Sequence, residues 1–172
     1  MPKPSFVEVV LPEDMRDVLH GLAMQTVGNF TPMDSGKLHC TVLFCGNELI
    51  SGPPERSRRA LHAMHAACAD APQRVRVHTL ALFPPGKQNL LVALLEVPAE
   101  WHRRRAELMA ELPVCSNESE WVPHVTLGKF GPRAQTDAAV GRLNVALEFD
   151  MVFRLRMSGP ELRGSRAMPT SS

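Results

Sequence analysis

The order of predicted elements along the chain occurs twice, and this repeat restricts the fold more than any other feature of the sequence. Each half indicates a strand, a helix, a strand, a helix and a strand. Equivalent positions lie about 85 residues apart. We therefore expect an α+β fold of two pseudo-symmetric lobes, each a small antiparallel-rich sheet flanked by helices. The interface between two such lobes is a natural place for a central cleft.

The elements of the first half are bounded by proline and glycine. Runs of β-branched and aliphatic residues predict strands, and apolar residues at intervals of three and four predict helices. Polar, glycine-rich stretches predict loops. The expected strands are 6–11, 38–44 and 75–83, the expected helices carry Met15, Val18, Leu19 and Leu22 and then Leu61, Met64 and Cys68, and 28–36 is an expected loop.

The second half follows the same order. Residues 90–97 are a continuous apolar run, typical of a strand buried on both faces. Pro98 favours the start of a helix. The last strand shows a strict period of two. We expect strands at 90–97, 121–130 and through Phe149, Met151, Phe153, Leu155 and Met157, helices carrying Trp101, Leu108, Met109 and Leu112 and at about 135–143, and a loop at 118–120.

The length of 172 residues suits one domain. We expect a single bilobal domain over residues 1–158, with lobes of about 5–83 and 88–158 whose chain ends can cross over. Residues 159–172 are rich in Gly, Pro, Arg and Ser, so we expect a disordered tail.

Charge and hydropathy exclude some classes of partner. The chain has 19 Lys and Arg against 18 Asp and Glu, which argues against a bulk polyanion binder but suits a small phosphate ligand or an RNA end. No apolar run approaches the roughly 20 residues that a membrane helix needs, and the N-terminus does not resemble a secretory signal. We expect a cytoplasmic protein, with a nuclear location left open, and reduced thiols at the four cysteines Cys40, Cys45, Cys68 and Cys115.

Equivalent strands of the two halves carry the same short motif. The first is His39-Cys40-Thr41, and the second is His124-Val125-Thr126. A His-x-Thr motif followed by an apolar residue is expected about 0.1 times by chance in a chain with this composition, so two are roughly a one per cent event. Because residues two apart on a strand share a face, each histidine projects with its threonine. Their middle residues turn into the core.

Two imidazoles and two hydroxyls that face one another across a cleft suit acid–base chemistry at a phosphodiester. One neutral ring can take a proton while the other, protonated, gives one. The threonine hydroxyls can donate to the non-bridging phosphate oxygens. This chemistry requires neither a metal nor a cofactor.

The motif pair resembles the two-histidine (2H) phosphoesterases, which include RNA 2′,3′-cyclic phosphodiesterases, enzymes called 2′-5′ RNA ligases, and a 2′-5′ phosphodiesterase-like domain of some kinase-anchoring proteins. The run 6–12, Phe44-Cys45-Gly46 and Phe83-Pro84 also look like family landmarks. The resemblance covers about residues 5–158. Cys40 departs from the family pattern, which often has an aliphatic residue there, and the absence of Tyr leaves Phe or Trp for aromatic contacts.

The resemblance implies a catalytic set of His39, Thr41, His124 and Thr126 in a metal-independent hydrolase. The substrate would be a 2′,3′-cyclic phosphate or a 2′-5′ phosphodiester of RNA or a nucleotide, and the resemblance does not choose between them. On resemblance, His124 is the base for water and His39 the acid for the leaving oxygen. The alternative is a nucleotide- or RNA-binding module with little or no turnover. We expect a monomer.

Other constellations are weaker. His62, His65 and Cys68 recur every three residues on one predicted helix, but no fourth metal ligand is evident, so we expect a helix surface. His78 could face the cleft because the strand alternation slips there, although a plain strand histidine is favoured. Cys45 has no base tied to it by sequence. For the basic clusters we favour solvated helix faces over RNA contacts; these clusters are Arg56, Arg58 and Arg59, and Arg103, Arg104 and Arg105.

Overall fold

The computed structural model describes residues 3–83, 89–112, 120–131, 146–160 and 162–164. The helix expected at about 135–143, most of the loop at 118–120, and Cys115 lie outside these ranges. The elements in chain order are β1 (Ser5–Val9), α1 (Glu13–Met24), β2 (Phe30–Pro32), a 3-10 turn (Ser35–Lys37), β3 (Cys40–Gly46), α2 (Glu48–Ser51), α3 (Pro54–Ala67), β4 (Gln73–Phe83), β5 (Leu90–Glu96), α4 (Ala99–Glu111), β6 (His124–Phe130), β7 (Leu147–Met151) and β8 (Leu155–Ser158).

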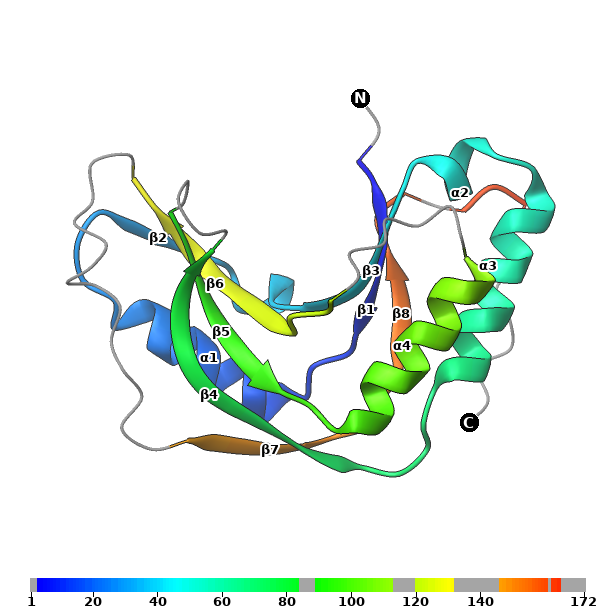
Figure 1. The fold of residues 1–172 in the computed structure, drawn as a ribbon. Helices are drawn as coiled ribbons and strands as arrows, with labels where there is room; N and C mark the ends of the chain where they lie inside the picture. Colours follow the sequence, from blue (N-terminus) through cyan, green and yellow to red (C-terminus); the bar gives the residue numbers. More distant parts are fainter. Residues whose placement is uncertain (1–2, 84–88, 113–119, 132–145, 161, 165–172) are drawn as a thin grey trace.

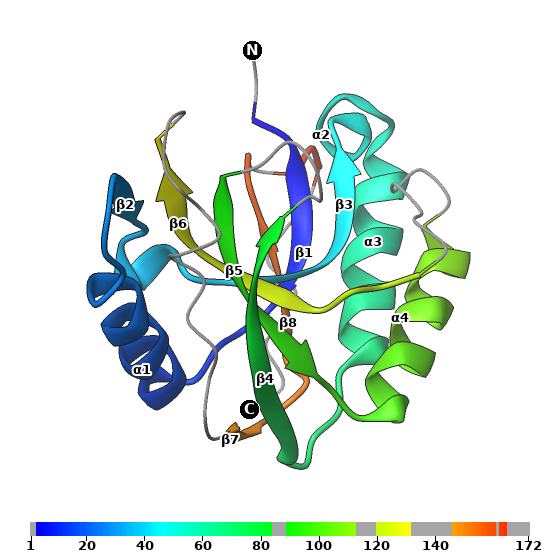
Figure 2. The ribbon, with the colours of Figure 1, turned by 60° about the vertical axis from the view of Figure 1, so that its left-hand side comes forward.

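The strands form two antiparallel sheets. One has the order β3-β1-β8 and the other the order β2-β6-β5-β4-β7. Helices α3 and α4 pack against each other and against β8 and β3, while α1 packs against β6 and β2. Figures 1 and 2 show α1 beside the five-stranded sheet and the α3–α4 pair beside the three-stranded sheet. The predicted α+β class with two antiparallel sheets and flanking helices is confirmed.

The sheets mix strands from the two halves of the sequence. Strands β2 and β4 of the first half join β5, β6 and β7, and β8 from the end of the chain pairs with β1. Strands β4 and β5 are consecutive in the chain and pair with each other, as sequential strands commonly do. The sheets therefore do not coincide with the ranges 5–83 and 88–158.

The last predicted strand is two strands in different sheets. Strand β7 pairs with β4, and β8 pairs with β1. Between them Phe153 is fully buried, and its ring lies 4.9 Å from the ring of Trp101 on α4. Alternating burial therefore continues through the break. A period of two fixes which side chains are buried, but it does not reveal that the chain has changed sheets.

The loop predicted at 28–36 contains a short edge strand, β2. Its pairing with β6 depends on Gly128, because a Cβ there would lie 2.4 Å from the Phe30 ring and from the Thr31 carbonyl oxygen. A three-residue strand ending in proline carries too few apolar residues to be read from the sequence.

Most predicted helix faces are buried, with local differences. On α1, Met15 and Leu19 are buried but Val18 is 40% exposed. On α3 the buried residues are small ones, Ser57 and Ala60 among them, whereas Leu61 and Met64 are only partly buried. No helix in the described part of the chain is long and apolar enough to cross a membrane.

The described part of the expected tail contacts the rest of the chain. Leu162 is 7% exposed and belongs to the core cluster. Gly164 has a φ of +69° and lies so close to Pro54 that a Cβ would approach it to 2.5 Å. These described residues therefore pack against the rest of the chain, while a disordered tail over residues 159–172 stays a prediction. Residues 165–172 lie outside the described part.

Candidate functional site

The first motif lies at the start of β3. His39 immediately precedes the strand and Thr41 is its second residue. Both side chains are half-buried, whereas Cys40 and Val42 are fully buried. The predicted alternation therefore holds here, with the histidine and threonine on the face opposite to Cys40 and Val42.

The second motif opens β6 in the five-stranded sheet. His124 and Thr126 are half-buried, and the intervening Val125 and the following Leu127 are fully buried. The two motifs thus have the same pattern of burial although they belong to different sheets.

Both histidines are held by the same local hydrogen bond. Nδ1 of His39 donates to the carbonyl oxygen of Lys37 over 2.9 Å, and Nδ1 of His124 donates to that of Val122 over 2.8 Å. A carbonyl oxygen only accepts, so Nδ1 carries the hydrogen in each ring. The neutral form of each ring then has its lone pair on Nε2, which is the tautomer that a proton-transferring histidine needs.

Two contacts join the motifs. The backbone N–H of His124 acts on the Cys40 thiol and lowers its pKa. The indole Nε1 of Trp121, just before β6, donates to the carbonyl oxygen of Thr41 over 3.1 Å. Figures 1 and 2 both place the start of β6 close to β3. The fold therefore brings together two motifs that are 85 residues apart in sequence.

Arg105 supports this junction from α4. It is 7% exposed, its Nε donates to the carbonyl oxygen of Val42 over 2.7 Å, and its guanidinium lies 5.6 Å from the centre of the Trp121 ring. The expectation of a solvated face is wrong for Arg105, because the carbonyl of Val42, beside a β-bulge in β3, needs a donor.

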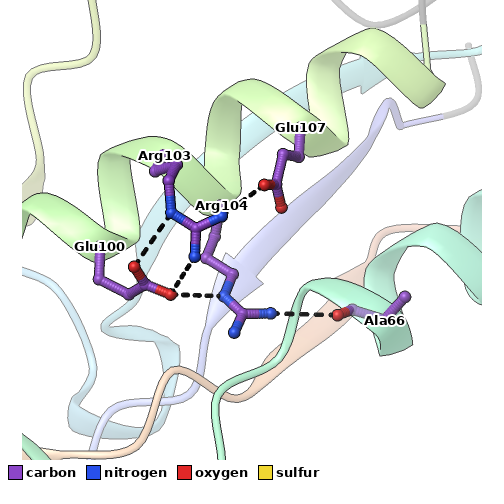
Figure 3. A network of polar contacts seen from close by, with 5 residues as sticks. All are labelled: Ala66, Glu100, Arg103, Arg104 and Glu107. Carbon is purple, nitrogen blue, oxygen red and sulfur yellow. Dashed lines mark hydrogen bonds and ion pairs between the residues drawn. The ribbon is translucent and has the colours of Figure 1, made fainter.

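The neighbouring arginines of α4 pair with carboxylates. Arg103 binds Glu100 and Glu107, and Arg104 binds Glu100 and the carbonyl oxygen of Ala66 on α3 (Figure 3). These contacts hold α4 to itself and to α3. The other cluster, Arg56, Arg58 and Arg59, is exposed on α3, as expected of a solvated face.

A buried carboxylate lies beside the first motif and was not among the site residues predicted from the sequence. Glu8 on β1 is 2% exposed, pairs with Arg156 of β8, and has Oε2 at 3.9 Å from Nδ1 of His39. The ring of Phe6 stacks on that of His39 with centroids 5.0 Å apart. The available signal was a lone acidic residue inside an apolar strand, since such residues are rarely buried unless paired.

A cavity of about 920 Å³ adjoins the second motif. Thr126 lines it together with Lys129 and the ion pair of Lys37 with Asp34, and the ammonium of Lys129 can attract an anionic ligand. Its size is in the range of small-molecule sites.

The structure also places the histidines and cysteines outside the two motifs. His62 and His65 are exposed, whereas Cys68 accepts from the backbone N–H of Leu155. Among the described residues, no three or more His, Cys, Asp or Glu side chains lie close enough to hold a metal ion. His78 is exposed at the irregularity in β4 that the slipped alternation indicated. Cys45 is buried in the core.

Burial raises the pKa of the Cys40 thiol to about 12 from an ordinary value of 9.0, the N–H of His124 lowers it, and the Glu8 charge raises it. The pKa of this thiol is higher in the folded state than in the unfolded state. The full stability is therefore present below a pH of about 9 and is lost progressively as the pH rises from about 9 to 12. We expect the free energy of unfolding to fall by up to ~1.4 kcal/mol per pH unit through this group. Urea unfolding at several alkaline pH values measures the slope.

The slope should become shallower in Cys40→Ala and stay unchanged in Val42→Ala, which shortens a buried side chain of the same strand without removing an ionisable group. Equal slopes in wild type and Cys40→Ala would show that this thiol does not ionise on unfolding.

An α+β fold of two antiparallel sheets that meet at paired His-x-Thr motifs defines the class of two-histidine phosphoesterases. The chain belongs to the 2′-5′ RNA ligase superfamily, whose family model matches residues 16–157. The resemblance inferred from the motifs is confirmed.

Solved structures share the fold along nearly the whole chain. TT0787 of Thermus thermophilus is 23% identical, with a TM-score of 0.67 over 95% of this chain and 100% of that chain. E. coli LigT complexed with 3′-AMP is 13% identical, with a TM-score of 0.65 over 94% and 97%. The MHV ns2 PDE domain is 11% identical, with a TM-score of 0.55 over 94% and 100%. A search of curated proteins found no significant match.

Proposed function

We propose that the protein is a metal-independent phosphoesterase that hydrolyses a 2′,3′-cyclic phosphate or a 2′-5′ phosphodiester of RNA or a nucleotide. The observation that carries the proposal is that both motif histidines donate Nδ1–H to the carbonyl two residues earlier, at motifs that the Trp121–Thr41 hydrogen bond brings together. This arrangement supports two proton-transferring Nε2 atoms at one site. Membership of the superfamily supports phosphoesterase chemistry in general.

In the proposed reaction, water attacks phosphorus while Nε2 of His124 takes its proton. The bond between phosphorus and the opposite ribose oxygen breaks, and Nε2–H of His39 protonates that oxygen. The hydroxyls of Thr41 and Thr126 donate to the non-bridging oxygens and hold the phosphorus in line. His124 thus gains one proton and His39 loses one. Exchange with solvent then restores the starting protonation of both rings.

The ligands of a structural relative agree with this substrate class. E. coli LigT has been solved with 3′-AMP, with ATP, with NADP+ and with phosphate. By analogy, a nucleotide or an RNA end would reach the motifs of this chain, and the cavity beside Thr126 would accommodate part of it. We propose that the chain does so as a monomer.

An assay of purified protein with EDTA against 2′,3′-cyclic nucleotides and 2′-5′ oligoadenylates tests the proposal. We expect turnover that chelation does not reduce, and the position of the product phosphate identifies which bond is cut. Binding without product after long incubation would instead favour a nucleotide- or RNA-binding module. Dependence on an added metal would contradict the two-histidine mechanism.

The threonine hydroxyls give a finer test. Replacing Thr41 or Thr126 by valine keeps the shape but removes the donor, so we expect transition-state binding to weaken by roughly 1–3 kcal/mol for each. The measurement is kcat/KM for each variant. Thr26→Val is the control, because its hydroxyl donates to the carbonyl of Leu22 at the end of α1. Losses no larger than in this control would remove the threonines from the site.

A further inference from the structure

The middle strand of the three-stranded sheet places a carboxylate between the first motif and an arginine. In the strand register Glu8 lies opposite Thr41 of β3 on one side and opposite Arg156 of β8 on the other. Directly paired residues project from the same face of a sheet. The row Thr41–Glu8–Arg156 therefore crosses one face of this sheet, beside His39.

The Glu8 side chain is only 3% exposed, and burying a carboxylate costs free energy unless it is paired. One oxygen, Oε1, binds Nε of Arg156. The arginine side chain is 51% exposed, and its pairing with Oε1 offsets the cost of burying the carboxylate. A small neutral residue at position 8 would avoid the cost of burying a carboxylate. Stability alone therefore does not account for a Glu8–Arg156 pair at this place.

The second oxygen of Glu8 faces the motif. Oε2 lies 3.9 Å from Nδ1 of His39, beyond hydrogen-bond range but within range of charge interaction. The carbonyl of Lys37 accepts the Nδ1 hydrogen, and the Phe6 ring stacks on the imidazole. When His39 is protonated, its positive charge therefore has a carboxylate on the Nδ1 side, and the Nε2–H donor remains for a leaving group.

The second motif has different neighbours at the equivalent positions. In the pairing of β5 with β6, Thr126 lies opposite Val92 and His124 opposite Leu94. The first motif is thus paired with a charged residue where the second is paired with apolar ones. This difference breaks the approximate equivalence of the two histidines.

We propose that Glu8, held by Arg156, is a positioning residue that keeps a carboxylate at the Nδ1 side of the His39 ring and thereby makes His39 the proton donor. The proposal rests on the proposed function. Glu8 neither takes nor gives a proton: the proton on Nε2 of His39 passes to the leaving ribose oxygen as the P–O bond breaks, and the ring becomes neutral.

Two matched substrates separate this role from a purely structural one. The first is the natural phosphodiester that the EDTA panel identifies, and the second is the same molecule with sulfur in place of the leaving oxygen. A thiolate departs without being protonated, so the second substrate does not need the acid. In Glu8→Gln we expect kcat to fall about 10- to 100-fold on the oxygen substrate and to stay within about threefold on the sulfur substrate.

A double variant covers the case in which Glu8→Gln fails to fold. Glu8→Leu with Arg156→Met replaces both charges by apolar groups of similar size, a change that buried ion pairs often tolerate. It should show the same selective loss. The control is Glu96→Gln, which removes a carboxylate from an exposed cross-strand pair with Arg76 on the other sheet, and it should leave both rates within about twofold.

An equal loss on both substrates, or no loss on either, would overturn the role of Glu8 while leaving the phosphoesterase proposal intact. A wild-type protein that turns over no member of the panel would overturn the proposed function, and the inference with it.

Discussion

Replacing His39 or His124 by alanine is expected to lower kcat by about 10²- to 10⁴-fold, the usual contribution of one general acid or base. The two rings act on the same phosphorus, so the double variant should be little worse than either single variant. Steady-state assays with the substrate found in the EDTA panel provide the measurement. Unchanged turnover in His39→Ala would remove that ring from the reaction.

A matched control is available on α3. His62 is exposed on that helix, and His62→Ala should retain wild-type turnover. Because both motif histidines are half-buried, the unfolding midpoint of each variant should also be measured. A fall in turnover without a matching fall in stability would locate the effect in the chemistry.

The sulfur-for-oxygen substrate is expected to restore about 10²-fold of the lost rate in His39→Ala and little in His124→Ala. The reason is that a thiolate needs no proton from an acid, whereas water still needs a base. The comparison uses the ratio of rates on the two substrates for each variant, which cancels differences in the amount of active protein. Wild type gives the reference ratio.

Restoration in His124→Ala instead of His39→Ala would reverse the two roles. The phosphoesterase reaction would stand, but Glu8 would then lie beside the base and its proposed role would fail. Restoration in neither variant would indicate that proton donation to the leaving oxygen does not limit the rate.

The sequence by itself determined the local structure around each motif. The alternation in His39-Cys40-Thr41 and in His124-Val125-Thr126 predicted which side chains would enter the core, and the structure agrees. Helical spacing likewise identified buried positions such as Met15 and Trp101. These properties are readable because they depend on neighbours two to four positions away, where the geometry of a strand or a helix fixes the face.

The choice of partners was decided only by the tertiary structure. Alternation assigns a face to each residue but does not say which strand lies alongside, so the split between β7 and β8 was not readable. The contact of Glu8 with Arg156 joins residues 148 positions apart, and Arg105 reaches a carbonyl 63 positions away. Pairing at such separations is selected by the packing of the whole core, because a backbone carbonyl or a buried carboxylate must find its donor wherever the folded chain provides one.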